Sequence, residues 1–115
     1  MFLRPAPPIP GLSAAAAAAA QAAPFAELFS VSRSRPSVAR ARQLAVYLDH
    51  VALGASVSAC ARTFARDRAT IRHACATIED LRDDPSFDAG ARRLEAALAA
   101  QRDMICALLA QGSAQ

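Results

Sequence analysis

Alanine supplies much of the apolar content of this chain, and this restricts the folds that the chain can adopt. Hydrophobic residues make up 54% of the 115 residues, yet aromatic residues make up only 5% and tryptophan is absent. Alanine favours the helix but buries little area. We therefore expect an all-α fold, a small helical bundle with a modest core and no large cavity for a substrate.

Apolar residues recur at helical spacing through the middle of the chain. In the first predicted helix, which Ser37 caps and Gly54 ends, four of them point inward: Leu44, Tyr47, Leu48 and Val51. A short second helix is predicted over about 57–64, with these residues buried: Cys60, Ala61 and Phe64. A third is predicted over about 68–82 with the inward residues Ile71, Ala74, Cys75, Ile78 and Leu81, and with the outward residues Ala69, His73, Ala76 and Asp80.

The flanking segments divide the chain into three parts. Residues 1–12 are rich in proline, and we expect a disordered leader there. The helix-turn-helix domain is expected over 13–84, with its motif core at 37–82. It includes the poly-alanine tract 13–23, which should be helical if it packs, and one helical turn in PFAELF (24–29).

Asp84-Pro85 should end the third helix, and 86–115 then form a C-terminal amphipathic helix and tail. The helix, over about 88–110, carries an apolar stripe: Leu94, Leu98, Ile105, Leu108 and Leu109. A monomer is expected, in which this helix packs on its own domain. A dimer through 88–110 is the alternative, because a single apolar stripe is compatible with either arrangement.

Several classes of protein are disfavoured by what the chain contains. The three cysteines are widely spaced and form no metal-ligand pattern with the two histidines, which favours a reducing cytoplasm and no metal. The early prolines argue against an export signal, and no 18-residue stretch is apolar enough to suggest a membrane protein. The sequence shows no nucleophile–base set and no paired carboxylates, so neither an enzyme nor a cofactor is expected.

Positive charge is concentrated in the middle of the chain. All thirteen basic residues are arginine, and residues 33–78 hold eight of them against Asp49 and Asp67, a balance of +6. Residues 79–115 hold four arginines against seven acids, a balance of −3. Such a cluster is typical of nucleic-acid binding, although a solvated basic surface is the alternative.

The second and third predicted helices, joined by a tight turn, suggest a helix-turn-helix that enters the major groove by the start of its second helix. Arg66 and Arg68 lie where the helix dipole favours phosphate, and Arg68 can reach a guanine edge. Thr70 suits thymine or phosphate. Asp67 either only caps the helix or also accepts from cytosine, and His73 is either a phosphate donor or an ordinary surface residue.

The loop SVSRSRPS (30–37) offers a second element for DNA. Arg33 and Arg35 could lie in an adjacent minor groove, where narrow AT-rich DNA concentrates negative potential. An ordinary basic loop is the alternative.

Longer motifs carry a resemblance to a known family. VARARQ (38–43), SVSACARTF (56–64) and RDRATIRHAC (66–75) resemble the C-terminal DNA-binding domain, domain IV, of the bacterial replication initiator DnaA, and FAELFS (25–30) looks like the short helix before its basic arm. The resemblance spans about 24–84. It implies a bundle similar to the Trp repressor, built around a helix-turn-helix.

The resemblance also implies which residues contact DNA. Arg33 and Arg35 match the minor-groove arm, and Arg42 matches a basic residue that contacts DNA. The recognition-helix signature matches Arg66, Asp67, Arg68, Ala69, Thr70 and His73, and Arg72 adds a charge at a variable position.

Three departures from the family pattern bear on DNA recognition. Ala69 replaces the first threonine of the signature and loses a base contact worth about 1–3 kcal/mol. Ser58 and Ala41 each stand where the family often has proline. Binding is therefore expected to be weaker, or directed at a shifted sequence.

The sequence as a whole predicts a DNA-binding protein. Because no GxxxxGK[ST] occurs, we expect a free-standing domain without an ATPase. It should bind double-stranded DNA at DnaA-box-like sites in the cytoplasm, at the nucleoid, and modulate replication initiation or transcription. Other replication or regulatory proteins are further candidate partners. The alternative is a protein–protein interaction module with the same fold and with weakened or lost DNA reading.

Overall fold

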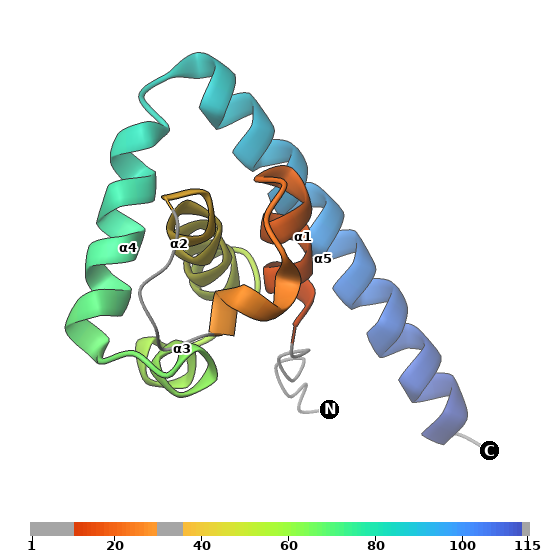
Figure 1. Ribbon diagram of the computed structural model, residues 1–115. Helices are drawn as coiled ribbons and strands as arrows, with labels where there is room; N and C mark the ends of the chain where they lie inside the picture. Colours follow the sequence, from red (N-terminus) through yellow and green to blue (C-terminus); the bar gives the residue numbers. More distant parts are fainter. Residues whose placement is uncertain (1–10, 30–35, 114–115) are drawn as a thin grey trace.

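The computed structural model describes residues 11–29 and 36–113, and within these ranges every regular element is helical (Figure 1). This confirms the predicted all-α class. The elements, in chain order, are α1 (Leu12–Ala20), the 3₁₀ helix η1 (Phe25–Phe29), α2 (Pro36–Val51), α3 (Val57–Phe64), α4 (Arg68–Leu81) and α5 (Pro85–Ser113). Most of the expected disordered leader, residues 1–10, lies outside the described residues.

The alanine tract forms α1 and packs against α2, as expected if it found a surface to pack on. Gly11, with a φ of 84°, leads the chain into α1 through a conformation that glycine adopts without strain. Ala14, Ala17 and Ala18 are buried in the core. Since the distance between packed helices depends on the side chains at the contact, methyl groups allow α1 and α2 to approach closely.

The segment PFAELF contains η1, which follows α1 in the chain and contacts α1, α2 and α3. Leu28 is fully buried, whereas Phe25 is 46% exposed. The ring of Phe29 stacks on the ring of Phe64, with centroids 5.4 Å apart. These contacts fix η1 beside the helix-turn-helix, because an aromatic pair adds orientation to the burial of its area.

Helix α2 occupies the centre of the bundle (Figure 1). Leu44, Tyr47 and Leu48 are buried as predicted, but two other predictions are wrong. Ser37 is not the N-cap, because the helix already begins at Pro36, whose fixed φ and missing N–H suit a first helical position. Val51 is 47% exposed, because the helix ends at this residue and the chain turns away.

The predicted second and third helices are confirmed as α3 and α4, with the third ending one residue early at Leu81. The Ser56 hydroxyl accepts from the Ala59 N–H at 3.0 Å and caps α3. The buried residues that join the two helices to the core are Cys60, Phe64, Ile71, Ala74 and Ile78. Three residues predicted to be buried are only half-buried: Ala61, Cys75 and Leu81.

The last helix begins at Pro85, three residues before its predicted start. Asp84 explains the difference, since its Oδ2 accepts from the Phe87 N–H at 3.2 Å in the manner of a cap, and proline suits the first turn. Along the predicted stripe Leu98 is buried, but Leu108 and Leu109 are each 60% exposed.

None of the helices within the described ranges combines the length and the apolar character needed to span a bilayer. The three cysteines are free; Cys60 is buried, and Cys75 and Cys106 are half-buried.

Candidate nucleic-acid interface

The chain reverses between α3 and α4 through a turn at Ala65. Its φ of 53° and ψ of 48° place Ala65 in the left-handed region, which glycine adopts at lower cost. The N–H of Arg66 donates to the Ala61 carbonyl at 3.0 Å and closes the end of α3. This turn leaves the first residues of α4 on the outside of the bundle.

Asp67 caps α4, which both of its predicted roles included. Its Oδ1 accepts from the Thr70 N–H at 2.8 Å. This hydrogen bond holds the pKa of Asp67 below its ordinary value, because the ionised carboxylate is the better acceptor. The cap satisfies one of the four N–H groups that every helix leaves unpaired at its start.

Five predicted DNA-binding residues share the outer surface of the first turns of α4. All of them are exposed: Arg68, Ala69, Thr70, Arg72 and His73. On the opposite side, Ile71 and Ala74 are buried in the core. The outward face predicted from the spacing is therefore confirmed, and it projects from a helix whose inner face is held firmly.

Arg66 is half-buried and lies at the turn itself. Its Nη1 donates to the carbonyls of Phe64 and Ala65, at 3.1 and 3.2 Å. A cation at this position complements the negative end of α3 and occupies carbonyls that the helix leaves without partners. Arg66 thus contributes positive charge to the surface and also holds the turn.

Arg42 connects α2 with η1. Its Nε donates to the Leu28 carbonyl at 2.7 Å, and its Nη2 donates to the Glu27 carbonyl at 3.2 Å. Burial, and then the nearby charge of Arg66, lower the pKa of Arg42 from its ordinary value, although an arginine remains charged at neutral pH. Two cations thus lie close enough to repel, and an anion between them would relieve that repulsion.

A groove of about 120 Å³ between α2 and α4 brings several of these residues together. Predicted site residues that line it are Arg42, Arg66, Thr70 and His73. Gln43 also lines it and was missed by the sequence reasoning. The spacing held a signal for it, since Ala39, Arg42, Gln43 and Val46 follow the helical pattern of a single face of α2.

Two predicted residues of the basic arm, Arg33 and Arg35, lie outside the described residues.

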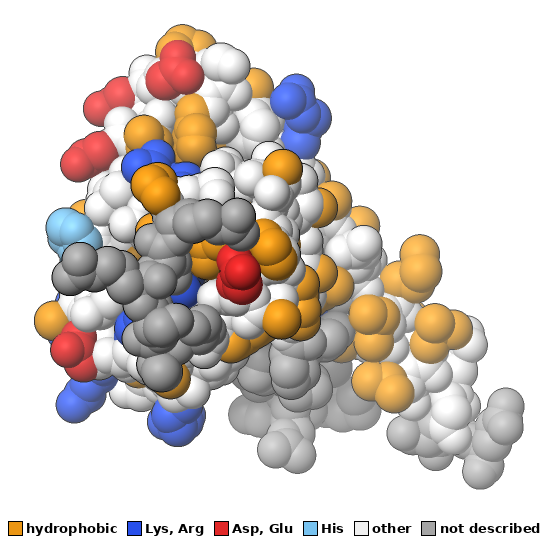
Figure 2. Space-filling model, viewed as in Figure 1, with side chains coloured by type: hydrophobic (Ala, Val, Ile, Leu, Met, Phe, Trp, Pro, Cys, Tyr) orange, Lys and Arg blue, Asp and Glu red, His pale blue; other side chains and the backbone are white. Residues whose placement is uncertain are grey.

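The charges of the surface are separated between the two ends of α4. Figure 2 shows arginine side chains at the lower edge of the view, around α3 and the start of α4, and acidic side chains at the top, around the turn between α4 and α5. Exposed acids at the far end are Glu79, Asp80, Asp83 and Asp84. An anionic ligand is therefore attracted to the helix-turn-helix end.

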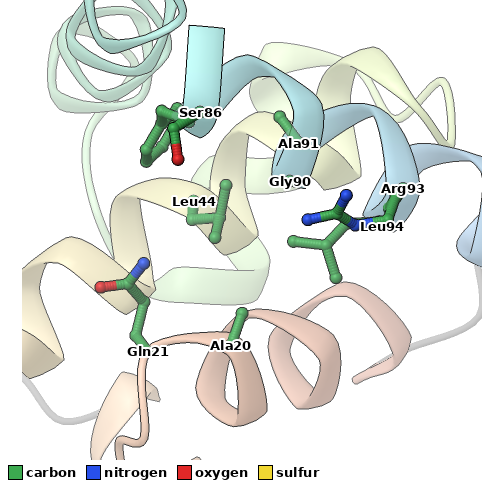
Figure 3. A pocket seen from close by; sticks show the side chains of 9 residues that line it. Ala20, Gln21, Leu44, Ser86, Gly90, Ala91, Arg93 and Leu94 are labelled. Carbon is green, nitrogen blue, oxygen red and sulfur yellow. The ribbon is translucent and has the colours of Figure 1, made fainter. Parts of the chain in front are cut away.

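A second, larger pocket lies elsewhere on the molecule. It measures about 310 Å³, and side chains of α1, α2 and α5 face it (Figure 3). Among the described residues that line it, Arg93 alone carries a charge, and none is a predicted DNA-binding residue. Within the same ranges, no group of three or more histidine, cysteine and acidic residues is placed to hold a metal ion.

Comparison with known proteins identifies the central part of the chain. The family model described as the bacterial dnaA protein helix-turn-helix matches residues 16–78, which is more than half of the chain and runs from α1 to near the end of α4. No curated protein and no solved structure matches.

Proposed function

Since the chain belongs to the family of bacterial DnaA helix-turn-helix domains, which bind DNA and are not catalytic, we propose that it recognises double-stranded sites resembling the DnaA box. By occupying such sites it modulates replication initiation, transcription or both, without hydrolysing ATP.

The observation that carries this proposal is the exposed start of α4. Arg68, Ala69 and Thr70 lie on the first turn of the helix, on a surface that no described element covers. A recognition helix reads base edges with its N-terminal residues, so a helix-turn-helix needs this turn to be free. The Asp67 cap keeps it helical.

Base reading falls to the residues nearest the start of α4. Arg68 carries the planar fork that can donate two hydrogen bonds to a guanine edge. Thr70 presents a hydroxyl and a methyl group, which suit adenine or thymine. Ala69 presents only a methyl group, so it can contact the thymine methyl but can form no hydrogen bond.

Phosphate binding falls to the residues around this turn. Arg72 and His73 are exposed one turn further along α4 and can donate to the DNA backbone. The charges of Arg42 and Arg66 raise the positive potential of the groove beside them. Gln43, on the same groove, adds a neutral amide donor.

The basic arm supplies the remaining part of the proposal. Arg33 and Arg35 precede α2 directly in the chain, and α2 borders the proposed DNA surface. We expect them to enter the minor groove beside the site bound by α4, where an AT-rich sequence strengthens the attraction for arginine.

Replacing Arg68 by alanine tests the proposal. We expect Arg68→Ala to weaken binding to a DnaA-box duplex by about 5- to 150-fold, which corresponds to the roughly 1–3 kcal/mol of a bidentate base contact. Binding to a scrambled duplex should weaken much less, because that binding depends on phosphate contacts. Fluorescence anisotropy with labelled duplexes measures both affinities.

Arg93→Ala is the matched control. It removes the same charge from an exposed position on α5, outside the proposed interface, and should leave the preference for the box unchanged. If Arg68→Ala and Arg93→Ala alter binding equally, α4 does not read the sequence. If the unmodified chain binds neither duplex, the alternative function as a protein interaction module is favoured.

A further inference from the structure

The apolar stripe of α5 continues beyond the part of the helix that packs on the bundle. Ala91 and Leu98 are buried against the core, whereas Met104, Leu108 and Leu109 are 60–66% exposed. Figure 1 shows the distal half of α5 extending past α1 and away from the other helices, and Figure 2 shows hydrophobic side chains gathered along it. The exposed residues thus form a continuous apolar surface on an isolated stretch of helix.

The composition of this stretch is unusual for a helix surrounded by water. Between residues 96 and 113 the only charged residues are Arg102 and Asp103. Helices in proteins gain most of their stability from packing an apolar face, and an isolated segment of about 12–15 residues is only marginally stable in water. A partner for the stripe would supply that packing.

The spacing along the stripe favours another helix as the partner. Ile105 and Leu108 lie three residues apart, Met104 precedes Leu108 by four and Leu109 follows Ile105 by four, the spacings that place apolar residues on one face for two helices to pair side by side. Met104 and Leu109 flank this line and widen the apolar contact.

The charge of the stretch favours a second copy of the same helix. Arg102 and Asp103 cancel, and they pair with each other at 3.5 Å, so two copies of the stretch do not repel. A strongly acidic or basic partner would meet no net opposite charge on this stretch. By contrast, two helix-turn-helix ends would repel each other, since residues 33–78 carry a balance of +6.

We propose that residues 101–112 of α5 form a self-association surface and that two copies of the chain pair through it. The contact is about 18 Å long, for twelve residues at a rise of about 1.5 Å each. It is therefore smaller than the roughly 800 Å² per partner of a standard interface, and the dimer is weak. The distal half of α5 lies on the far side of the bundle from α4 (Figure 1), so pairing leaves both recognition helices free.

Sedimentation equilibrium of the full chain tests this proposal without DNA, so its outcome is independent of the proposed function. Between about 5 and 500 μM, where a weak dimer becomes populated, we expect the average mass to rise from 12.0 kDa towards twice that value. The double variant Leu108→Gln/Leu109→Gln should raise the Kd at least about tenfold. Glutamine retains helix propensity, and both positions are exposed, so the fold should survive.

The matched control is Ala107→Gln/Ala110→Gln, which places the same side chains on the opposite face of the same turns. It should dimerise like the unmodified chain, and circular dichroism should show equal helicity for all three proteins. A constant mass of 12.0 kDa at every concentration would overturn the proposal. A dimer that both double variants weaken equally, or that neither weakens, would overturn it as well.

Discussion

Asp67, Arg66 and Arg42 each make hydrogen bonds that organise the fold, and each also lies at the surface proposed to meet DNA. Asp67 caps α4, Arg66 closes α3, and Arg42 holds η1 against α2. A substitution at any of these positions therefore alters the shape of the surface as well as its charge. Arg68 is a cleaner probe, since its side chain is exposed and the fold does not depend on it.

In the proposed base-reading turn, Ala69 stands where the recognition-helix signature that this chain resembles has a threonine. Its side chain is exposed on the first turn of α4, so the hydroxyl and methyl group that a threonine would carry are absent from the proposed DNA surface. No described neighbour takes their place. We therefore expect a lower preference for the box than a threonine at this position would give, by the roughly 1–3 kcal/mol of a base contact.

Asp49 is a buried carboxylate away from the proposed interface. Its Oδ1 accepts from the Ser13 hydroxyl at 3.3 Å, and its Oδ2 accepts from the Cys60 thiol at 3.7 Å. Burial raises the pKa of Asp49 above its ordinary value of 3.8, because the charged form loses its hydration. Burial, and then the charge of Asp49, raise the pKa of the Cys60 thiol to about 12, so this cysteine remains neutral.

The raised pKa of Asp49 predicts how stability depends on pH. Because the folded protein binds this proton more tightly than the unfolded chain, Asp49 favours folding most below pH 3.8, and that contribution is lost as the pH rises through the raised pKa. Asp49→Asn keeps an acceptor for Ser13 without a charge. We expect the variant to have the higher Tm at pH 7, with an advantage that shrinks on acidification towards pH 4.

Thermal melts of both proteins across this pH range measure the difference. A difference in Tm that stays constant with pH would show that Asp49 titrates alike in the folded and unfolded states, against this prediction.

At the scale of elements, Arg82 fixes the angle between α4 and α5. Its Nε donates to Asp88 at 2.6 Å, and its Nη1 donates to Glu95 at 3.0 Å and to the Tyr47 hydroxyl at 2.9 Å. The network joins α2, α4 and α5, and these hydrogen bonds raise the pKa of Arg82. Removing the cation leaves two carboxylates and the hydroxyl of the buried Tyr47 without their shared donor.

Arg82→Met should lower the free energy of unfolding by about 1–3 kcal/mol, because partly buried acceptors lose charged donors. Arg92→Met is the matched control, since Arg92 pairs with the same Asp88 at 2.9 Å but its side chain is 75% exposed. Its effect should be below about 1 kcal/mol, as for other exposed pairs. Urea denaturation followed by circular dichroism compares the two, and equal losses would contradict the role given to Arg82.

The sequence was sufficient to predict the helix starts that depend on a capping residue close by in the chain. Ser56 and Asp67 are caps that act within one helical turn, so the starts of α3 and α4 could be predicted from the residues alone. The starts of α2 and α5 were placed too late, because Pro36 was assigned to the preceding loop and Pro85 to the end of the third helix, although proline is equally suited to begin a helix.

The site was predictable only in part, for a related reason. The motif around Arg68 lies on one helix, so spacing was enough to predict its exposed face. The groove beside it joins α2 to α4, and the bonds of Arg42 reach back to η1. Such contacts depend on how distant segments pack together, which local patterns do not determine.

At the scale of the whole molecule, three regions are arranged along the chain with different surface chemistry. The helix-turn-helix end is basic, the turn between α4 and α5 is acidic, and the distal part of α5 is apolar and carries no net charge. DNA is therefore expected at the first region and a second copy of the chain at the third. If both occur together, a pair of chains offers two recognition helices, and linked binding to two sites is tighter than either binding event alone.

The most direct test of the central claim compares the purified chain on a DnaA-box duplex and on a scrambled duplex of equal length, at about 50 and 200 mM salt. We predict that the box is preferred at both concentrations. If about four to six arginines neutralise phosphates, log affinity should fall against log salt with a slope near about −4 to −5. Equal affinity for the two duplexes at both salt concentrations would contradict sequence reading by α4, and a flat salt response would contradict the electrostatic part of the account.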